Sequence, residues 1–233
     1  MRETIKTSNK GNLIIISGTT CAGKGTVSKK LLEKNKNIYR SVSYTSRSIR
    51  GGDIEGNEYF FITKDKFLEK IKNDEFLEYA IVHGKDYYGT PKTNILEKLN
   101  NGIDCLLEIN IEGAKNIKEK FPDAILIFIL APSMEEVKRR IIARGLEDKE
   151  KILDRFKSAY NELNEVTKYN YVVVNDIVDE AVKKIEAIIL AEKCRVDRIE
   201  EIYTGTLEEQ IHESLIEKNL INIERTIDWF YFL

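Results

Sequence analysis

Apolar residues fall in short runs that alternate with longer amphipathic stretches along most of the chain. The run at 124–130, AILIFIL, has no polar residue, which is typical of a strand covered on both faces. The predicted core strands are 13–16, 104–109, 124–130 and 171–174. The predicted helices are 24–34, 63–73, 93–101, 111–120, one starting at 133, one ending at 164, and 179–193. This alternation predicts a parallel α/β sheet with helices on both faces.

The segment 76–95 gives a weaker signal. Its apolar and polar positions alternate only in part, and we expect it to end in a turn at Gly89-Thr90-Pro91. No internal repeat or low-complexity linker interrupts the sequence.

A glycine-rich loop directly follows the first predicted strand. Its sequence from Gly18 to Thr26, GTTCAGKGT, has the spacing of a phosphate-binding loop, with Gly25 where Ser or Thr is usual. The glycines allow a tight turn that directs backbone N–H groups to one point, and Lys24 adds positive charge for the outer phosphates. The alternative is a strand–turn–helix corner with a chance glycine spacing. Cys21 either fills space in the loop or is a thiol sensitive to oxidation.

Two arginines lie in the glycine-interrupted stretch 41–61. Arg47 and Arg50, with the hydroxyls of Ser43 and Tyr59 nearby, offer donors that suit the oxygens of a phosphomonoester. Arginine pairs are also common in solvated surface turns, and that interpretation is favoured when the stretch is considered alone.

Two glutamates are candidates for ligand binding. Glu78 lies among apolar neighbours, so its carboxylate needs donors, either from a nearby arginine or lysine or from a base edge with two N–H groups. Glu108 is near the carboxyl end of a predicted strand, where ligands gather in α/β sheets, and an acidic group there can hold Mg²⁺. Asn110 follows just past the end of that strand.

Three further arginines occur at 140, 144 and 155. They are placed to converge from a mobile flap onto a chain of phosphates. When the stretch is considered alone, the favoured interpretation of Arg140, Arg144 and Arg155 is a charged helix face.

Composition narrows the class of protein. The 233 residues carry a net charge of −2, so no general attraction to nucleic acid is expected. No run of about 18 apolar residues is present, so no membrane span is expected. Residues 1–12 have no apolar signal core, which favours the cytoplasm. The cysteines Cys21, Cys105 and Cys194 are widely spaced and indicate neither a disulfide framework nor a zinc site.

Several separated motifs agree in order and spacing with one family. They are SGTTCAGKGT, SVSYTSRSIRGGD, EYFF, FLEYA, YYGT, LEINIEGA, RRIIARG followed by Arg155, and VVVND. On these motifs, residues 11–193 resemble the guanylate kinase family. The resemblance implies a P-loop NTPase-type sheet, an inserted GMP-binding subdomain at about 40–92, a helical lid at about 140–160, and a C-terminal extension at 194–233.

The resemblance implies transfer of the γ-phosphate of ATP to GMP, giving ADP and GDP, within purine nucleotide metabolism. The implied catalytic residues are Lys24, Arg140, Arg144 and Arg155. The implied ATP-binding residues are Gly18, Thr19, Thr20, Cys21, Ala22, Gly23, Lys24, Gly25, Thr26 and Asn175. The implied GMP-binding residues are Ser43, Arg47, Arg50, Tyr59, Glu78, Tyr88, Thr90, Glu108 and Asn110. Mg²⁺ is implied as cofactor, with Thr26 and Glu108 nearest to it.

The chain also departs from the family pattern. Cys21 replaces a glycine, Gly25 removes the hydroxyl nearest the metal, Asn110 stands where Asp is usual, and Asp53 replaces Glu. The GKGT ending of the loop resembles adenylate kinases, so a kinase for another nucleoside monophosphate is one alternative, although Glu78 argues against AMP. A non-catalytic binding module of guanylate kinase shape is another.

The extension after residue 194 shows helical spacing of apolar residues and closes with IDWFYFL. We expect an additional helical pair that covers the core. The alternative is a dimer contact or a partner-docking segment, so monomer and homodimer both stay open.

Overall fold

The computed structural model describes residues 10–82, 85–143 and 149–195. By its internal contacts the chain divides into a unit of Asn9–Lys193 and a second unit formed by Met1–Ser8 and Cys194–Leu233. The fold given below is that of the first unit. Arg144 and the predicted helical pair after residue 195 lie outside the described residues.

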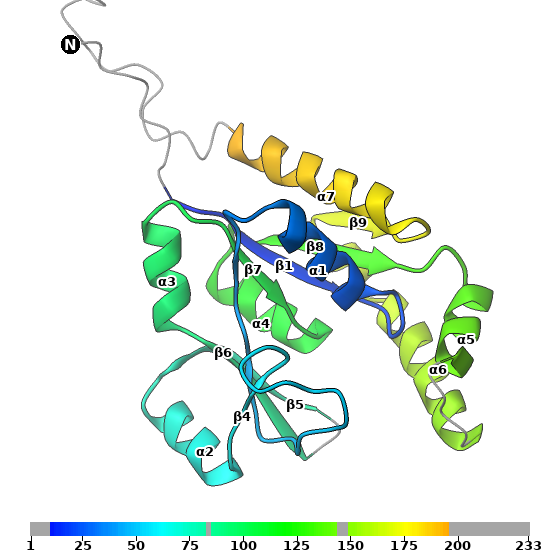
Figure 1. Ribbon diagram of the computed structural model, residues 1–233, viewed down its shortest axis with the longest axis horizontal. Coiled ribbons are helices and arrows are strands. Elements are labelled where there is room, and N and C mark those ends of the chain that lie inside the picture. Colours follow the sequence, from blue (N-terminus) through cyan, green and yellow to red (C-terminus); the bar gives the residue numbers. More distant parts are fainter. Residues whose placement is uncertain (1–9, 83–84, 144–148, 196–233) are drawn as a thin grey trace, which may run out of the picture. The chain divides into compact units, whose positions relative to one another are not determined.

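A parallel sheet of five strands forms the centre of this unit, in the order β2-β7-β1-β8-β9 (Figure 1). All of its neighbouring pairs are parallel, and β1 is in the middle, with Ile14 opposite Leu106 on one side and Ile125 on the other. The strands are β1 (Leu13–Gly18), β2 (Tyr39–Arg40), β7 (Cys105–Glu108), β8 (Ile125–Leu130) and β9 (Tyr171–Val174).

Helices cover both faces of this sheet, which explains why every residue of β1 is buried. Ile14 and Ile16 pack in a cluster with α1 (Lys24–Lys34) and α7 (Val178–Lys193). The alternate residues Leu13 and Ile15 pack with α3 (Thr93–Asn100) and α4 (Ile111–Lys120). The predicted α/β architecture is therefore confirmed.

A second sheet has the order β4-β3-β6-β5 and lies near α2 (Lys64–Lys72) (Figure 1). Its strands are β3 (Tyr44–Thr45), β4 (Phe60–Phe61), β5 (Phe76–Val82) and β6 (Asp86–Pro91).

The predicted turn at Gly89-Thr90-Pro91 is wrong, because these residues form the end of β6, antiparallel to β5. Gly89 serves packing in this strand: a Cβ there would lie 2.8 Å from ring atoms of both Phe67 and Phe76. A glycine required by close packing looks in the sequence like a glycine required by a turn.

Two helices, α5 (Met134–Ala143) and α6 (Lys149–Leu163), overlap the segment at about 140–160 for which a lid is predicted, and a 3-10 turn follows at Val166–Lys168. Val137 and Ala159 from these helices form a small buried cluster with Cys21 of the glycine-rich loop. Cys21 thus fills space between the loop and the helices α5 and α6. Over the stretches 10–82, 85–143 and 149–195, the helices are either too short or too polar to cross a lipid bilayer.

Candidate active site

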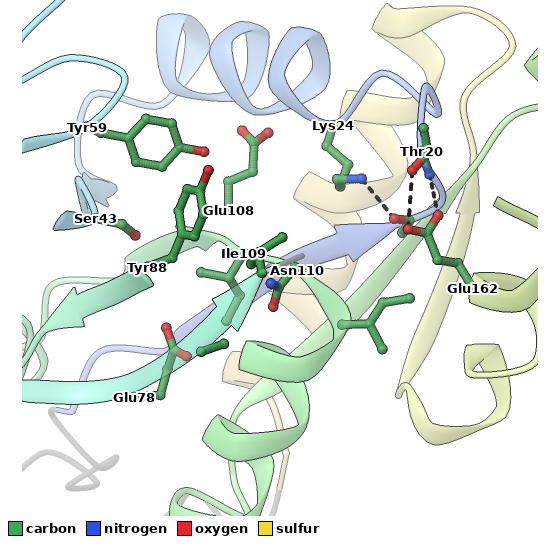
Figure 2. A pocket seen from close by; sticks show the side chains of 14 residues that line it. Thr20, Lys24, Ser43, Tyr59, Glu78, Tyr88, Glu108, Ile109, Asn110 and Glu162 are labelled. Atoms are coloured by element: carbon green, nitrogen blue, oxygen red, sulfur yellow. Dashed lines mark hydrogen bonds between the residues drawn. The ribbon is translucent and has the colours of Figure 1, made fainter. Parts of the chain in front are cut away.

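A cleft of about 280 Å³ lies at the carboxyl ends of β1 and β7, where the fold predicts ligand binding. Figure 2 shows Lys24 and Thr20 at one end of this cleft and Glu78 toward the other, with Glu108 and Asn110 in the wall between. The side chains that line it come from both sheets, from the glycine-rich loop and from α6. Those proposed from the sequence are Gly18, Thr20, Lys24, Ser43, Tyr59, Glu78, Tyr88, Glu108 and Asn110.

The glycine-rich loop has the backbone that its sequence predicts. Gly18 has φ 141°, and a Cβ there would lie 2.1 Å from the carbonyl oxygen of Ile129. Gly23 has φ 90° and is the N-cap residue directly before α1. The Lys24 ammonium donates to the carbonyl oxygens of Gly18 at 2.8 Å and Thr19 at 3.0 Å. Lys24 is therefore folded back over the loop, with its positive charge against the backbone carbonyl oxygens of Gly18 and Thr19.

Two of the proposed residues hold the loop from the side. Asn175 donates from Nδ2 to the carbonyl oxygen of Ala22 at 2.8 Å. Arg140 donates from Nη1 to the same oxygen at 3.2 Å, from Nη2 to the carbonyl oxygen of Asn175 at 3.1 Å, and from Nε to Glu136 at 2.7 Å. The guanidinium groups of Arg139 and Arg140 lower the pKa of Glu136 to about 2. Arg140 thus places a fixed positive charge against the loop.

Arg155 lies on α6 and lines a second, neighbouring cleft of about 590 Å³ together with Cys21, Lys24 and Asn110. Thr20 and Lys24 line both clefts, so Arg155 and the glycine-rich loop border the same second cleft.

The loop residues differ in exposure. Thr19 is 1% exposed, its hydroxyl is buried, and its backbone N–H donates to the carbonyl oxygen of Ile129 at 3.3 Å. Ala22 uses its backbone N–H in a turn with the Thr19 carbonyl at 3.1 Å.

Glu78 is the buried acid of the site, with 4% of its side chain exposed. It lies on β5 opposite Thr90 of β6, and the Thr90 hydroxyl donates to Glu78 Oε1 at 2.6 Å. Burial raises the pKa of Glu78 to about 7, against the lowering effects of Thr90 and Lys120. The other carboxylate oxygen, Oε2, lies next to Gly113 at the start of α4. The structure therefore brings together Glu78 and Thr90, two of the residues that the family resemblance assigns to GMP.

Replacing Gly113 with Ala tests how closely Glu78 is confined. A Cβ at Gly113 would lie 2.9 Å from Glu78 Oε2 and 3.2 Å from Asn110 Oδ1, so the carboxylate must shift. We expect the KM for the ligand read by Glu78 to rise about 10-fold, a cost typical of a displaced polar contact. Thermal stability should not fall much, because Ala is a better helix former than Gly by about 1 kcal/mol. Steady-state kinetics with Gly51→Ala as control, where no atom lies within 4 Å of the added Cβ, check this. An unchanged KM would show that Glu78 is not confined.

The hydroxyl and arginine cluster predicted near 41–61 is formed in part. Arg47 is buried, with 7% exposed, and donates to Asp53 at 2.9 Å. Its guanidinium also lies 5.5 Å from the ring centre of Tyr59, whose ring is 5.4 Å from that of Tyr88. Burial alone would lower the pKa of Arg47, but its bonds to Asp53 and Tyr88 outweigh burial and raise it. Arg47 is thus a buried, fixed charge rather than part of a solvated turn. Arg50 has an exposed side chain.

Of the two residues proposed for the metal, Glu108 lies near the start of α1 and Thr26 does not line the cleft. Glu108 is exposed at the end of β7, and a Cβ at Gly25 would lie 3.5 Å from its Oε1. Thr26 is one position further along α1, so it projects about 100° away around the helix, and it does not line the cleft. Asn110 caps α4 by accepting from the Gly113 N–H at 2.7 Å. In the described part of the chain, no three acidic, cysteine or histidine side chains gather as a metal cage.

Of the polar residues that line the cleft, one is absent from the sequence prediction. Glu162 on α6 lines both clefts and accepts from the Thr20 backbone N–H at 2.6 Å. It is seven residues after Arg155, which places both on the same face of a helix, and this spacing is the signal that points to it.

Comparison with known proteins identifies the family of this chain. The family model for guanylate kinase matches residues 10–192. A guanylate kinase of Clostridium perfringens (strain SM101 / Type A) is 54% identical over 217 residues, covering 93% of this chain and 100% of that relative. A guanylate kinase of Clostridium tetani (strain Massachusetts / E88) is 55% identical over 208 residues, covering 89% of this chain and 99% of that relative. The crystal structure of guanylate kinase from Anaplasma phagocytophilum has a TM-score of 0.70 and 34% identity, covering 82% of this chain and 91% of its own. The match to the family model and these identities show that the chain belongs to the guanylate kinase family.

Proposed function

We propose that the cleft transfers the terminal phosphoryl group of ATP to GMP, with the phosphate loop as the donor site and Glu78 as the acceptor-reading group. The single observation that carries this assignment is that one cleft joins Lys24 to Glu78. A cationic loop and a buried acid in the same cleft match the two substrates of guanylate kinase: a triphosphate and a purine with an N–H-rich edge.

Glu78 selects guanine by its hydrogen-bonding capacity. Guanine presents N1–H and the N2 amino group side by side, and an ionised carboxylate accepts from both. Thr90 already occupies one lone pair of Oε1 at 2.6 Å, which holds the carboxylate in place and leaves the outward lone pairs for the base. Adenine lacks the donor pair, so its binding would leave a buried acid unpaired.

The charged groups around the loop stabilise the phosphoryl group during transfer. Phosphoryl transfer depends on in-line positioning and on positive charge around the moving group. Lys24 supplies a charge above the loop, Arg140 supplies one at its side, and Arg155 supplies one from α6. Asn175 keeps the loop closed through Ala22. Water is excluded when the lid helices close over the cleft, which limits hydrolysis of ATP.

Glu108 is the residue of this site that fits Mg²⁺. It is an exposed carboxylate within reach of the N-terminus of α1, and Mg²⁺ in such enzymes keeps several waters and phosphate oxygens as ligands rather than a protein cage. When bound, the ion neutralises charge on the donor phosphates. Thr26 is the weaker candidate because it projects away from Glu108.

The acceptor phosphate has donors on the hairpin side of the cleft. Ser43, Tyr59 and Tyr88 line the cleft there, and Arg47 contacts both tyrosines. We assign these groups to the phosphate of GMP. Arg50, exposed in this structure, joins them only if its loop moves toward the ligand.

A coupled assay of ADP formation tests the function. The full chain is given MgATP with GMP, dGMP, AMP, UMP or CMP as acceptor. We expect turnover with GMP and a kcat/KM for AMP that is lower by about 10⁴-fold, as for sites that bind a polar edge. Turnover with AMP alone would favour a different nucleoside monophosphate kinase, and no turnover with any acceptor would favour a non-catalytic binding module.

A further inference from the structure

A carboxylate of the protein itself occupies the phosphate loop. Glu162 accepts from the Thr20 backbone N–H at 2.6 Å and from the Thr20 hydroxyl at 3.2 Å. The Ser158 hydroxyl, one helical turn earlier on α6, donates at 3.2 Å to Glu162 Oε1, the oxygen that also accepts from the Thr20 hydroxyl. Figure 2 shows Glu162 and Lys24 at the same end of the cleft. An acidic side chain is thus bound where the loop presents its donors.

This contact uses a donor that the motif provides for anions. Backbone N–H groups of a phosphate loop bind phosphate oxygens, and a carboxylate oxygen is a chemically similar acceptor. One N–H makes one good hydrogen bond, so Thr20 cannot serve Glu162 at 2.6 Å and a phosphate oxygen equally well. Two anions at hydrogen-bond distance from the same donor also repel one another. Glu162 and the terminal phosphate of a nucleotide therefore compete for this part of the loop.

The helix that carries Glu162 also carries a charge proposed for catalysis. Arg155, Ser158 and Glu162 are three and four residues apart, which places them on one face of α6. All three line the same cleft of about 590 Å³ together with Lys24. A shift of α6 away from the loop would therefore move Glu162 and Arg155 together, because one helix carries both.

We propose that Glu162 is a positioning residue that fills part of the phosphate loop in the nucleotide-free protein and is displaced by the phosphates of ATP. Its displacement shifts α6 and seats Arg155 beside the phosphoryl group to be transferred. The inference rests on the proposed function, because it takes the loop as the donor site.

The test compares Glu162→Gln with the unchanged chain. Gln keeps the size of the side chain and one acceptor oxygen but loses the charge that repels phosphate. We expect MgATP and inorganic tripolyphosphate, each titrated calorimetrically without GMP, to bind roughly 10-fold more tightly to the variant, the size of one charge-assisted hydrogen bond. In steady state the KM for ATP should fall while the KM for GMP stays the same. Glu162→Ala should change affinity in the same direction.

The matched control is Glu165→Gln, which removes one negative charge three residues later, where Glu165 pairs with Lys168 on the surface. Its nucleotide affinity should not change. Binding to Glu162→Gln that is unchanged or weaker would overturn the inference, since Glu162 would then brace the loop in the complex as well. Failure of the proposed function is a separate result, namely no ADP from ATP and GMP with the unchanged chain. Tripolyphosphate binding still tests the exchange of anions in that case.

Discussion

Glu78→Gln is expected to lower kcat/KM for GMP by about 10²- to 10³-fold while the KM for ATP changes by less than about threefold. The carboxylate accepts two hydrogen bonds from N–H groups of guanine. In the variant, the amide NH₂ faces one of these N–H groups, so a charge-assisted hydrogen bond is lost and a repulsive contact between two donors is introduced. Thr90 stays bonded to the acceptor oxygen of the variant, so the hairpin should keep its structure. Initial-rate kinetics with each substrate varied in turn measure both effects.

The pH dependence of GMP binding isolates the same group. The pKa of Glu78 is raised by burial to about 7, so the carboxyl is mostly protonated at pH 6 and mostly ionised at pH 8. Because guanine needs the ionised form, the KM for GMP should fall about 10-fold as the pH rises from 6 to 8. The phosphate of GMP also titrates near pH 6, and it does so whether GMP is given to the unchanged chain or to Glu78→Gln. The difference between the profiles of the unchanged chain and Glu78→Gln therefore reports Glu78. If Glu78→Gln lost affinity for GMP and for ATP to the same extent, the role given to Glu78 would be contradicted.

Lys24→Met is expected to lower kcat by about 10³-fold or more. The ammonium is held over the loop by the carbonyl oxygens of Gly18 and Thr19, and it is the charge that the loop offers to the transferring phosphoryl group. Met keeps an unbranched side chain that is one atom shorter and has no charge, so charge stabilisation of the transition state is lost. The measurement is kcat at saturating ATP and GMP, with thermal unfolding followed in parallel.

Lys34→Met is the control for this variant. It removes a positive charge from the same helix, where Lys34 pairs with Asp179 on the surface at 3.0 Å. A surface pair of this kind contributes at most about 1 kcal/mol, so activity should be unchanged. If Lys24→Met kept more than about a tenth of the activity while folding normally, the loop would not be the donor site.

Regular elements with strong periodicity were predictable from the sequence. The strand predicted at 13–16, which runs from Leu13 to Gly18 in the structure, the loop and the helix Lys24–Lys34 follow from an apolar run, glycine spacing and amphipathic spacing, which are all local signals. The two-residue strands β2, β3 and β4 were not predictable, because two residues do not define a period. Gly89 was mistaken for a turn residue since its packing partners lie elsewhere in the sequence.

In the site, too, single residues were predictable from local signals, whereas contacts between distant residues were not. Glu78 was identified as an acid in need of donors, and the strand register that brings Thr90 to it is a tertiary fact. Arg140 was proposed as a phosphate ligand, but its bonds to Ala22 and Asn175 add a role in holding the loop. Glu162 was missed because its partner, Thr20, is 142 residues away. Cytoplasmic location, oligomeric state and the role of residues 196–233 stay predictions.

A crystal structure of the full chain with GMP and ADP bound tests the central claim most directly. The account predicts the guanine N1 and N2 atoms within about 3 Å of the two oxygens of Glu78 and the β-phosphate of ADP on the loop beside Lys24. A guanine base turned away from Glu78, or a nucleotide phosphate bound outside the loop, would contradict it.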